Sequence, residues 1–407
     1  MTRGGAIGCA ALLTCADAPS PIPARTEPAL LHDAVVAWED GRIVHAGPRS
    51  SWGGAVDEEH RGAVLPGFVD CHTHLPFYGW RDDEFEARLR GRTYRDLHGE
   101  GGIARSARML AEASDREVLD FSGRVLDEML SHGTTTVELK TGYGLSIEGE
   151  LRQARLARRL ADEAAQTATV TLLACHAVPP GMAREEWVRS ACEELIPAAV
   201  LEGLADAVDI YVEDIAFSLP DLERVADAAS GAGLPLRVHA DQLGRTGAAE
   251  AAARLGARSA DHLNHAGPEG IAALGAGGTV GVLLPASTLL LRAPEPSVAE
   301  MVEAGAAVAV ATDCNPGTSP VASIPEAIAL ACSRYGLTPG QAVVATTINA
   351  ARVLGLEDRL GSLAPGRRAD FVLLDAPEPR AIPYRPGHNP VVATFIGGEP
   401  AQPSIDR

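Results

Sequence analysis

Between residues 65 and 356, short apolar runs alternate with longer segments of helical periodicity. The runs are continuously apolar, which is typical of parallel strands buried on both faces. The segments between them, such as Glu148–Ala165 and Asp221–Ala232, are rich in Ala and Leu and predict helices. Eight strand–helix units in about 290 residues predict a (β/α)8 TIM-type barrel of the α/β class. The eight runs are Val64–His74, Thr134–Lys140, Thr169–His176, Ala207–Glu213, Leu234–His239, Arg258–Leu263, Thr279–Pro285 and Ala306–Asp313.

Both ends of the chain have a different pattern, in which short β-type segments are separated by turn residues. Ala34–Trp38 and Arg42–Ala46 flank Glu39-Asp40-Gly41 and predict a hairpin. Ala369–Leu374 and Val391–Ile396 predict two further strands in the tail. Neither end is long enough to bury a core alone, so we expect both to build one small β-sandwich. The expected domains are residues 1–64 and 357–407 for the sandwich and residues 65–356 for the barrel.

The apolar stretch Ala6–Ala16, which follows Arg3, faintly resembles a secretory signal. Its basic start is weak, so we interpret it as a strand of the N-terminal β-domain. No apolar run reaches the roughly 18 residues that span a bilayer. The expected location is the cytoplasm, where the seven cysteines stay reduced.

The formal net charge is −19, which disfavours nucleic acid and anionic membrane surfaces as partners. It leaves room for a small anionic substrate, because such a molecule responds to local charge. A homodimer is left open.

Polar residues recur where the predicted barrel strands end. In a (β/α)8 barrel these carboxyl ends meet at one rim, which carries the active site. The sequence therefore predicts a functional site at this rim. The residues concerned are His72 and His74, Glu138, Lys140 and Tyr143, His176, Glu213, His239, Asp261 and His262, and Asp313.

His72 and His74 are two residues apart on a strand, so their rings lie on the same face. Two solvated or core histidines would give the same motif. His239 and Asp313 at other strand ends make a metal site the better interpretation. Three imidazoles and one carboxylate with room for water are typical of a catalytic site. Imidazole ligands suit zinc or iron, so we expect one such ion per chain.

Two segments resemble the amidohydrolase superfamily. Leu65–His74 (LPGFVDCHTH) is similar to its opening strand, and Pro365–Asp370 (PGRRAD) to the entry into its C-terminal sandwich. Within the superfamily, the chain resembles the imidazolonepropionases, and KTGYGL (140–145) with TDCNPG (312–317) is the most specific part of that resemblance. The resembling segments are Phe77–Tyr94, Gly99–Arg108, His132–Leu145, Ala174–Gly181, His239–Leu243, Ser259–Leu263, Leu283–Pro285 and Ala311–Pro320.

The resemblance implies hydrolytic opening of 4-imidazolone-5-propanoate to N-formimidoyl-L-glutamate. A metal on His72, His74, His239 and Asp313 would activate a water. Asp313 would take the water proton and pass it to the leaving ring nitrogen, and His262 would orient the water or stabilise the oxyanion.

The resemblance also implies substrate contacts. Arg81 matches the residue that binds the propionate, and its fork geometry suits a carboxylate. A surface salt bridge with Asp82, Asp83 or Glu84 is the plain alternative for Arg81. The other implied contacts are Tyr143, His176, Asn315, Gly317 and Thr318, together with Gln242 on the ring.

Gln242 distinguishes between functions. Related deaminases have a Glu three residues after the histidine of the fifth strand, because a carboxylate must protonate the ring. Gln242 cannot shuttle protons, so a deaminase is disfavoured. Binuclear relatives often use a carboxylated Lys at the end of the fourth strand, where this chain has Glu213. A single metal is therefore expected, with Glu213 left open as a ligand of a second ion.

Tyr78, Trp80 and Ala286–Leu290 depart from the family pattern near the expected pocket. A related mononuclear amidohydrolase that acts on a different carboxylated ring is therefore the first alternative, and a deaminase is the next. A metal-free barrel that serves as an interaction module should have lost some of the four ligands, all of which are present.

Overall fold

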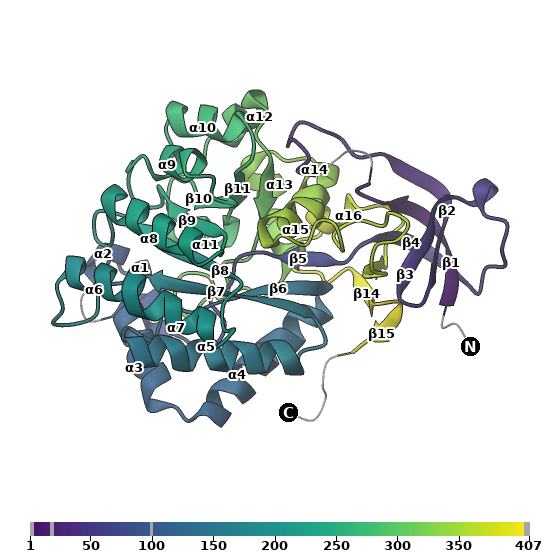
Figure 1. Cartoon of the computed structure of the whole chain (residues 1–407). Helices are drawn as coiled ribbons and strands as arrows, with labels where there is room; N and C mark the ends of the chain where they lie inside the picture. Colours follow the sequence, from purple (N-terminus) through teal and green to yellow (C-terminus); the bar gives the residue numbers. More distant parts are fainter. Residues whose placement is uncertain (1–3, 17–19, 98–100, 403–407) are drawn as a thin grey trace.

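The structure is a computed structural model that describes residues 4–16, 20–97 and 101–402. Arg3 and the first residues of the Gly99–Arg108 segment lie outside this part of the chain. A barrel with surrounding helices forms the larger body, and a sheet made from both ends of the chain lies beside it (Figure 1).

Within the described residues, the barrel contains eight parallel strands in sequential order, which confirms the predicted α/β barrel. Beyond the last residues of β5 and β12, a parallel bridge between Thr73 and Cys314 joins the two outer strands. The N–H of Asp313 donates to His72 O (3.0 Å), and that of His74 donates to Cys314 O (2.9 Å). The strands are β5 (Phe68–Asp70), β6 (Thr134–Lys140), β7 (Thr167–Cys175), β8 (Ala207–Val212), β9 (Leu236–Ala240), β10 (Ser259–His262), β11 (Val280–Leu283) and β12 (Val308–Val310).

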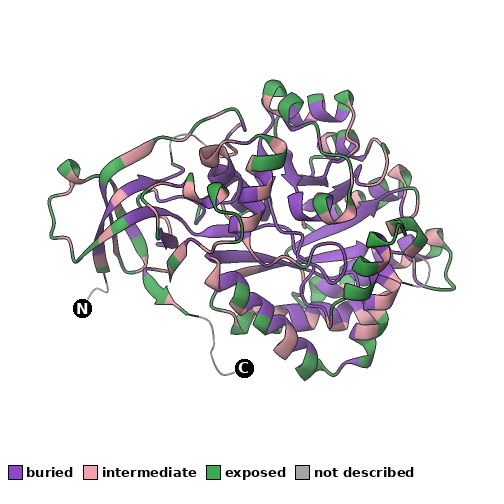
Figure 2. Ribbon diagram, turned by 180° about the vertical axis from the view of Figure 1, so that it is seen from behind, coloured by how far each residue is buried: buried purple, intermediate pink, exposed green. Residues whose placement is uncertain are grey.

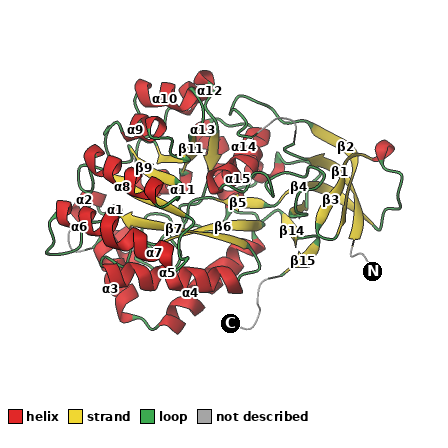
Figure 3. Ribbon diagram, in the orientation of Figure 1, coloured by secondary structure: helices red, strands yellow, loops and turns green. Residues whose placement is uncertain are grey.

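Helices cover the outside of the barrel, with their buried faces toward the strands (Figures 2 and 3). The two helices predicted from Glu148–Ala165 and Asp221–Ala232 are present within two residues of the expected bounds. Ser146 caps the first of them by accepting from the N–H of Gly149. The main covering helices are α4 (Asp115–Ser131), α5 (Ile147–Glu163), α7 (Ile196–Leu201), α8 (Leu219–Gly231), α9 (Ala248–Arg254), α10 (Pro268–Gly275), α12 (Val298–Ala304), α13 (Ile324–Tyr335) and α15 (Ile348–Leu354).

The two ends of the chain build one mixed β-sheet, as expected from their pattern. In the described residues it has seven strands in the order β15-β14-β13-β4-β1-β2-β3. The apolar stretch that begins at Ala6 and faintly resembles a secretory signal lies largely in β1. This strand pairs with both β2 and β4 near the middle of the sheet. The strands are β1 (Gly4–Leu13), β2 (Leu30–Glu39), β3 (Arg42–Pro48), β4 (Glu58–Pro66), β13 (Phe371–Leu374), β14 (Val391–Ile396) and β15 (Glu399–Ala401).

The single strand expected over Val64–His74 is wrong in one respect, because the run divides at Gly67. β4 ends at Pro66 in the terminal sheet and β5 begins at Phe68 in the barrel. A Cβ at Gly67 would lie 2.3 Å from Thr135 Oγ1, so a glycine is needed where the chain crosses between the sheets.

Packing of aromatic side chains holds the terminal sheet together. Phe371 stacks on Phe395 with ring centroids 4.5 Å apart, and Trp38 lies 5.2 Å from Phe371. In the described residues, which include every cysteine, no disulfide is formed. No helix of the described chain is both long enough and apolar enough for a membrane span.

Candidate metal centre and active site

The predicted metal ligands meet at the carboxyl-end rim of the barrel. His72 and His74 follow β5, His239 lies in β9, and Asp313 follows β12. All four side chains are buried. Asp313 and His262 also have φ values of 55° and 76°, in the left-handed region that non-glycine residues rarely adopt. Such backbone strain commonly gathers at functional sites.

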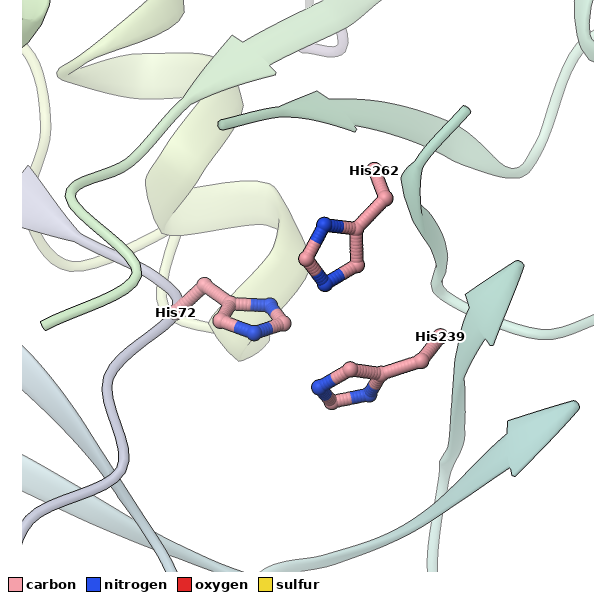
Figure 4. Close-up of side chains that lie close together, drawn as sticks. All are labelled: His72, His239 and His262. Atoms are coloured by element: carbon pink, nitrogen blue, oxygen red, sulfur yellow. The ribbon is translucent and has the colours of Figure 1, made fainter. Parts of the chain in front are cut away.

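The side-chain atoms of this group face one another. His74 Nε2 lies 3.3 Å and His72 Nε2 3.6 Å from Asp313 Oδ1. The ring centroids of His72 and His239 are 4.5 Å apart, and the His262 ring faces the same space (Figure 4). His72 Nε2, His239 Nε2 and Asp313 Oδ1 are buried and have no hydrogen-bond partner among the described residues.

These unpaired atoms fit a metal ion. Buried polar atoms are normally hydrogen-bonded, so several unpaired acceptors around one space are the arrangement that coordination of a metal ion requires. The candidate ligand atoms of His72, His74 and Asp313 lie within 4.8 Å of one another, and so do those of His72, His239 and His262. Neutral imidazoles and a carboxylate are a donor set for a transition metal. We call His72, His74, His239 and Asp313 the metal-side cluster.

Two buried aspartates orient the rings of this cluster. His72 Nδ1 donates to Asp261 Oδ2 (2.6 Å), and His239 Nδ1 donates to Asp209 Oδ1 (3.1 Å). These bonds leave each Nε2 as the free acceptor, which is the tautomer that a metal requires. Lys140 Nζ lies between the two aspartates, 2.7 Å from Asp209 Oδ2 and 3.9 Å from Asp261 Oδ2.

Burial sets the charge of four of the five histidines at this rim, whereas Asp209 outweighs burial at His239 and raises the pKa of that ring. Burial lowers the pKa of His72, His74 and His176 below the usual value, and it lowers that of His262 to about 3. These four rings are therefore neutral at pH 7. Burial alone would raise the pKa of Asp313, but the His74 ring and the neighbouring imidazoles bring it below its ordinary value. Asp313 is therefore an ionised acceptor.

A small cavity opens above the metal-side cluster. Among the residues predicted as substrate contacts, the structure brings His176, Gln242, Asn315 and Thr318 to its wall, beside the catalytic candidate His262. Tyr94 and Tyr211 line the same cavity and were missed from the sequence as site residues. The Tyr211 hydroxyl is buried without a hydrogen-bond partner among the described residues.

The KTGYGL segment forms a loop at the end of β6 that holds Tyr143 and His176. Glu150 of α5 accepts from the N–H groups of Gly142 (2.9 Å) and Gly144 (2.8 Å), which anchors this loop to the helix. His176 Nδ1 donates to Gly142 O (3.0 Å), so its Nε2 is left for the cavity. The Tyr143 ring lies 5.4 Å from that of His176.

Asn315 organises the turn that follows Asp313. Its Oδ1 accepts from the N–H groups of Gly317 (3.0 Å) and Thr318 (2.7 Å), and its Nδ2 donates to Asp313 O (2.7 Å). A single side chain therefore connects the turn to the metal-side cluster, as is typical of Asx-type turns.

Arg81 lies beside this turn, buried rather than on the surface. Its Nε donates to Glu84 (3.0 Å), which is one of the ion pairs considered as the alternative. Its Nη1 also donates to the Ser106 hydroxyl. A Cβ on Gly317 would clash with Arg81 Nη2, so a larger residue there would displace the guanidinium from its present position. Arg81, Arg88 and the 315–318 turn form what we call the loop wall.

An open hollow adjoins the loop wall on its outer side. Trp80, Arg81, Phe85, Arg88 and Gly317 line it. Arg88 Nη2 donates to Gly317 O (2.8 Å), whereas its Nε and Nη1 are buried without a partner in the described residues. The loop wall therefore has guanidinium N–H groups that no described residue accepts from.

Glu213 lies apart from the metal-side cluster. The N–H of Leu243 donates to its Oε1 (2.8 Å), and burial raises its pKa to about 7. Among the described residues it belongs to none of the groups whose ligand atoms converge within 4.8 Å.

The departures from the family pattern lie outside the cavity wall in the described chain. Tyr78 and Trp80 pack against Phe121, with ring centroids 5.7 and 5.6 Å apart. Residues 286–290 belong to α11 (Pro285–Leu291).

Lys140 and Asp261 were predicted to lie at this rim, but Asp209 and the buried network that it forms with them were not. The available signal was a set of charged residues inside runs that are otherwise continuously apolar. Charges buried on both faces of a sheet must pair with one another.

The fold is shared with solved amidohydrolase-type structures. A triazine hydrolase variant superimposes with a TM-score of 0.74 at 17% identity, covering 98% of this chain and 95% of that one. The 5-methylcytosine deaminase of Klebsiella pneumoniae gives 0.73 at 17% identity, covering 99% of both chains. At these identities the likeness shows the fold alone.

Sequence comparisons are more specific. A sequence model of the amidohydrolase family matches residues 63–401. The imidazolonepropionase of Rubrobacter xylanophilus is 47% identical over 83% of this chain and 81% of its own length. That of Methylobacterium nodulans is 43% identical over 91% of this chain and 94% of its own. The chain therefore belongs to the amidohydrolase family and, within it, to the imidazolonepropionases.

Proposed function

We propose that this chain hydrolyses 4-imidazolone-5-propanoate to N-formimidoyl-L-glutamate with the help of one zinc or iron ion. The observation that carries the chemistry is the set of buried, unpaired atoms His72 Nε2, His239 Nε2 and Asp313 Oδ1 around one space. The substrate class is supported by relatives named imidazolonepropionase, whose similarity to this chain extends over nine-tenths of its length.

The metal-side cluster would hold the ion. A bound ion of this kind polarises a carbonyl and lowers the pKa of a water toward neutrality. The chain's own residues then decide where protons and charges go.

Asp313 is the proton carrier in this proposal. It lies in the cluster, 3.3 Å from His74 Nε2. Because it is ionised, it can accept the proton of the attacking water. Water adds to the ring carbonyl carbon, and the carbon–nitrogen bond of the ring then breaks. Asp313 returns the proton to the leaving nitrogen, so the product is a carboxylic acid with an open formimidoyl chain, and the acid then releases its proton to solvent at neutral pH. The neutral His262 ring orients the water or stabilises the oxyanion.

The substrate is held from both sides of the cavity. Arg81 supplies the cation for the propionate, and Tyr143 is a further contact of the substrate. Gln242 has a donor and an acceptor for the ring but cannot carry a proton between atoms. The Asn315 turn brings Thr318 to the same cavity wall.

The test is incubation with freshly generated imidazolonepropionate, with loss of ring absorbance and formation of formiminoglutamate as the readouts. Protein freed of metal by a chelator should be inactive and should recover with zinc or iron. Ammonia release from cytosine, guanine or adenine rings, with no ring opening, would overturn the proposal in favour of a deaminase.

Gln242→Glu sharpens the same test. It places an ionisable group beside the cluster but supplies nothing that ring opening lacks. We expect measurable ring opening, with an altered pH profile, and no gain of ammonia release from the bases. A gain of deamination would show that the residue at 242 determines the reaction.

A further inference from the structure

Lys140 is the only lysine in the sequence, and its side chain is completely buried below the metal-side cluster. Its Nζ lies 2.7 Å from Asp209 Oδ2, 2.9 Å from Glu138 Oε2 and 3.9 Å from Asp261 Oδ2. All three carboxylates are fully buried as well. A charged group with no access to water must be neutralised by its neighbours, so these groups depend on one another.

Two of these carboxylates reach the proposed metal through one histidine each. Asp209 accepts from His239 Nδ1 (3.1 Å), and Asp261 accepts from His72 Nδ1 (2.6 Å). The ammonium therefore lies one aspartate away from two different ligand rings. Partners of this kind fix the tautomer and orientation of a ligating histidine and raise its basicity.

The side chains around Lys140 Nζ are of the kind that bind a metal cation. Ligand atoms of Asp209, His239 and Asp261 lie within 4.8 Å of one another, which is the spacing of groups that hold a metal. Lys140 Nζ is already among them. A lysine carries its compact positive charge at the end of a flexible four-carbon chain, so the ammonium group can take the position of a second ion.

We propose that Lys140 is a positioning residue whose ammonium acts as a built-in cation. It holds Asp209 and Asp261 so that His239 and His72 present Nε2 to a single metal ion, and it occupies the space where a second ion would otherwise bind. The proposal rests on the metal site of the proposed function, but it does not depend on the identity of the substrate.

The adjacent Arg237 provides a matched control. Its Nη1 pairs with Glu138 Oε1, and its side chain is also buried. Neither Arg237 nor Glu138 contacts a ligand histidine in the described hydrogen bonds. Glu138 Oε2 also lies 2.9 Å from Lys140 Nζ, but Glu138→Gln keeps an amide oxygen that can accept from the ammonium. Arg237→Met/Glu138→Gln therefore removes a buried ion pair and keeps the lysine, an acceptor for it and both aspartates.

The experiment measures the metal dissociation constant by chelator competition, together with the absorption spectrum of the cobalt-loaded protein. Lys140→Met should weaken metal binding by roughly 10–100-fold, the usual effect of losing a partner of a ligating histidine. The cobalt spectrum should change, and metal content in excess zinc should rise above that of the parent. The control pair should keep the parent's affinity and spectrum although its unfolding temperature falls.

Lys140→Met alone leaves carboxylates uncompensated, so a charge-balanced variant is needed where it does not fold. Lys140→Met/Asp261→Asn restores the charge balance, and we expect it to fold and still to bind metal more weakly. Folded Lys140 variants with the parent's affinity and spectrum would overturn the proposal, and so would an equal loss of affinity in the control pair.

The unmutated protein gives an independent readout. Because Lys140 is the only lysine, protein labelled with ¹⁵Nζ-lysine has a single side-chain ammonium signal. This signal should shift when metal is removed and return when it is added, and an unchanged signal would contradict the proposal. A parent protein that binds no metal at all would instead refute the proposed function, so the two failures are distinguishable.

Discussion

The metal-side cluster and the loop wall border the same candidate active-site cavity but are built in different ways. The cluster comes from the ends of barrel strands, and Asp209 and Asp261 hold two of its rings from below. The loop wall comes from the turn after Asp313 and from helix α1 (Asp82–Leu89) with the residue before it. In the loop wall, two nitrogen atoms of Arg88 have no partner among the described residues.

The difference separates two tasks. The cluster is positioned by the fold before any substrate arrives, which is how electrostatic stabilisation of a transition state is prepared. The loop wall has guanidinium N–H groups without a partner among the described residues, which suits a negatively charged group that binds and leaves. Changes in the cluster should therefore abolish metal binding and turnover, whereas changes in the loop wall should weaken substrate binding with the metal in place.

The largest effect is expected from His239→Ala. It removes a ligand and leaves Asp209 without its imidazole partner. Metal affinity should fall by more than the ~10²-fold typical of losing an outer-shell partner, and activity should reach background. His60→Ala is the control, since His60 lies in the terminal sheet and bonds Leu374 O (2.8 Å). Metal analysis and the ring-opening assay give both readouts, and full turnover without metal would end the proposed mechanism.

Asp313→Asn should have the next largest effect, at least ~10²-fold on kcat, because it removes the proton acceptor. The amide oxygen keeps a ligand atom, so metal content should fall less than in His239→Ala. Steady-state kinetics at saturating zinc separate the two contributions. A kcat close to the parent's would assign the proton transfer to another group, with His262 the nearest candidate.

Arg81→Ala tests the loop wall. Loss of a charge-assisted hydrogen bond to the propionate should cost about 1.5–3 kcal/mol in kcat/KM, mainly through KM. Metal content should equal that of the parent. Arg90→Ala is the control, because Arg90 forms an exposed pair with Glu86 on the same helix region. An unchanged kcat/KM would reduce Arg81 to a partner of Glu84 and weaken the substrate assignment.

The two regions also differ in how far the sequence could predict them. The cluster followed from the spacing of His72 and His74 and from polar residues at strand ends, because strand geometry fixes which side chains share a rim. Arg81 and the turn residues of the loop wall were predicted only from the resemblance to the imidazolonepropionases. Nothing in the local pattern says that Gly317 must leave room for Arg81, because that contact joins residues far apart in the sequence.

Other features needed the structure as well. The division of the first run at Gly67 depends on Thr135 of the next strand, which no local rule reveals. The Lys140 network depends on which face of three strands points inward. The two tyrosines of the cavity, Tyr94 and Tyr211, have no polar signature that separates them from packing residues.

The smallest expected effect concerns Glu213, which borders the substrate side through the 242–243 backbone. Burial raises its pKa from 4.5 to about 7, so the folded protein keeps this proton where the unfolded chain has released it. The free energy of unfolding should therefore fall by at most about 1.4 kcal/mol per pH unit as the pH rises from 4.5 to 7. Above pH 7 this contribution should level off.

Glu213→Gln cannot ionise and keeps an oxygen for the N–H of Leu243. Its free energy of unfolding, relative to that of the parent, should therefore rise between pH 5 and 7 and stay constant from 7 to 8. Urea unfolding of both proteins at these pH values measures the difference, with the exposed Glu202→Gln as the control. Parallel pH profiles would mean that Glu213 is ionised throughout this range. The substrate side would then carry a buried negative charge, which would oppose binding of the negatively charged propionate.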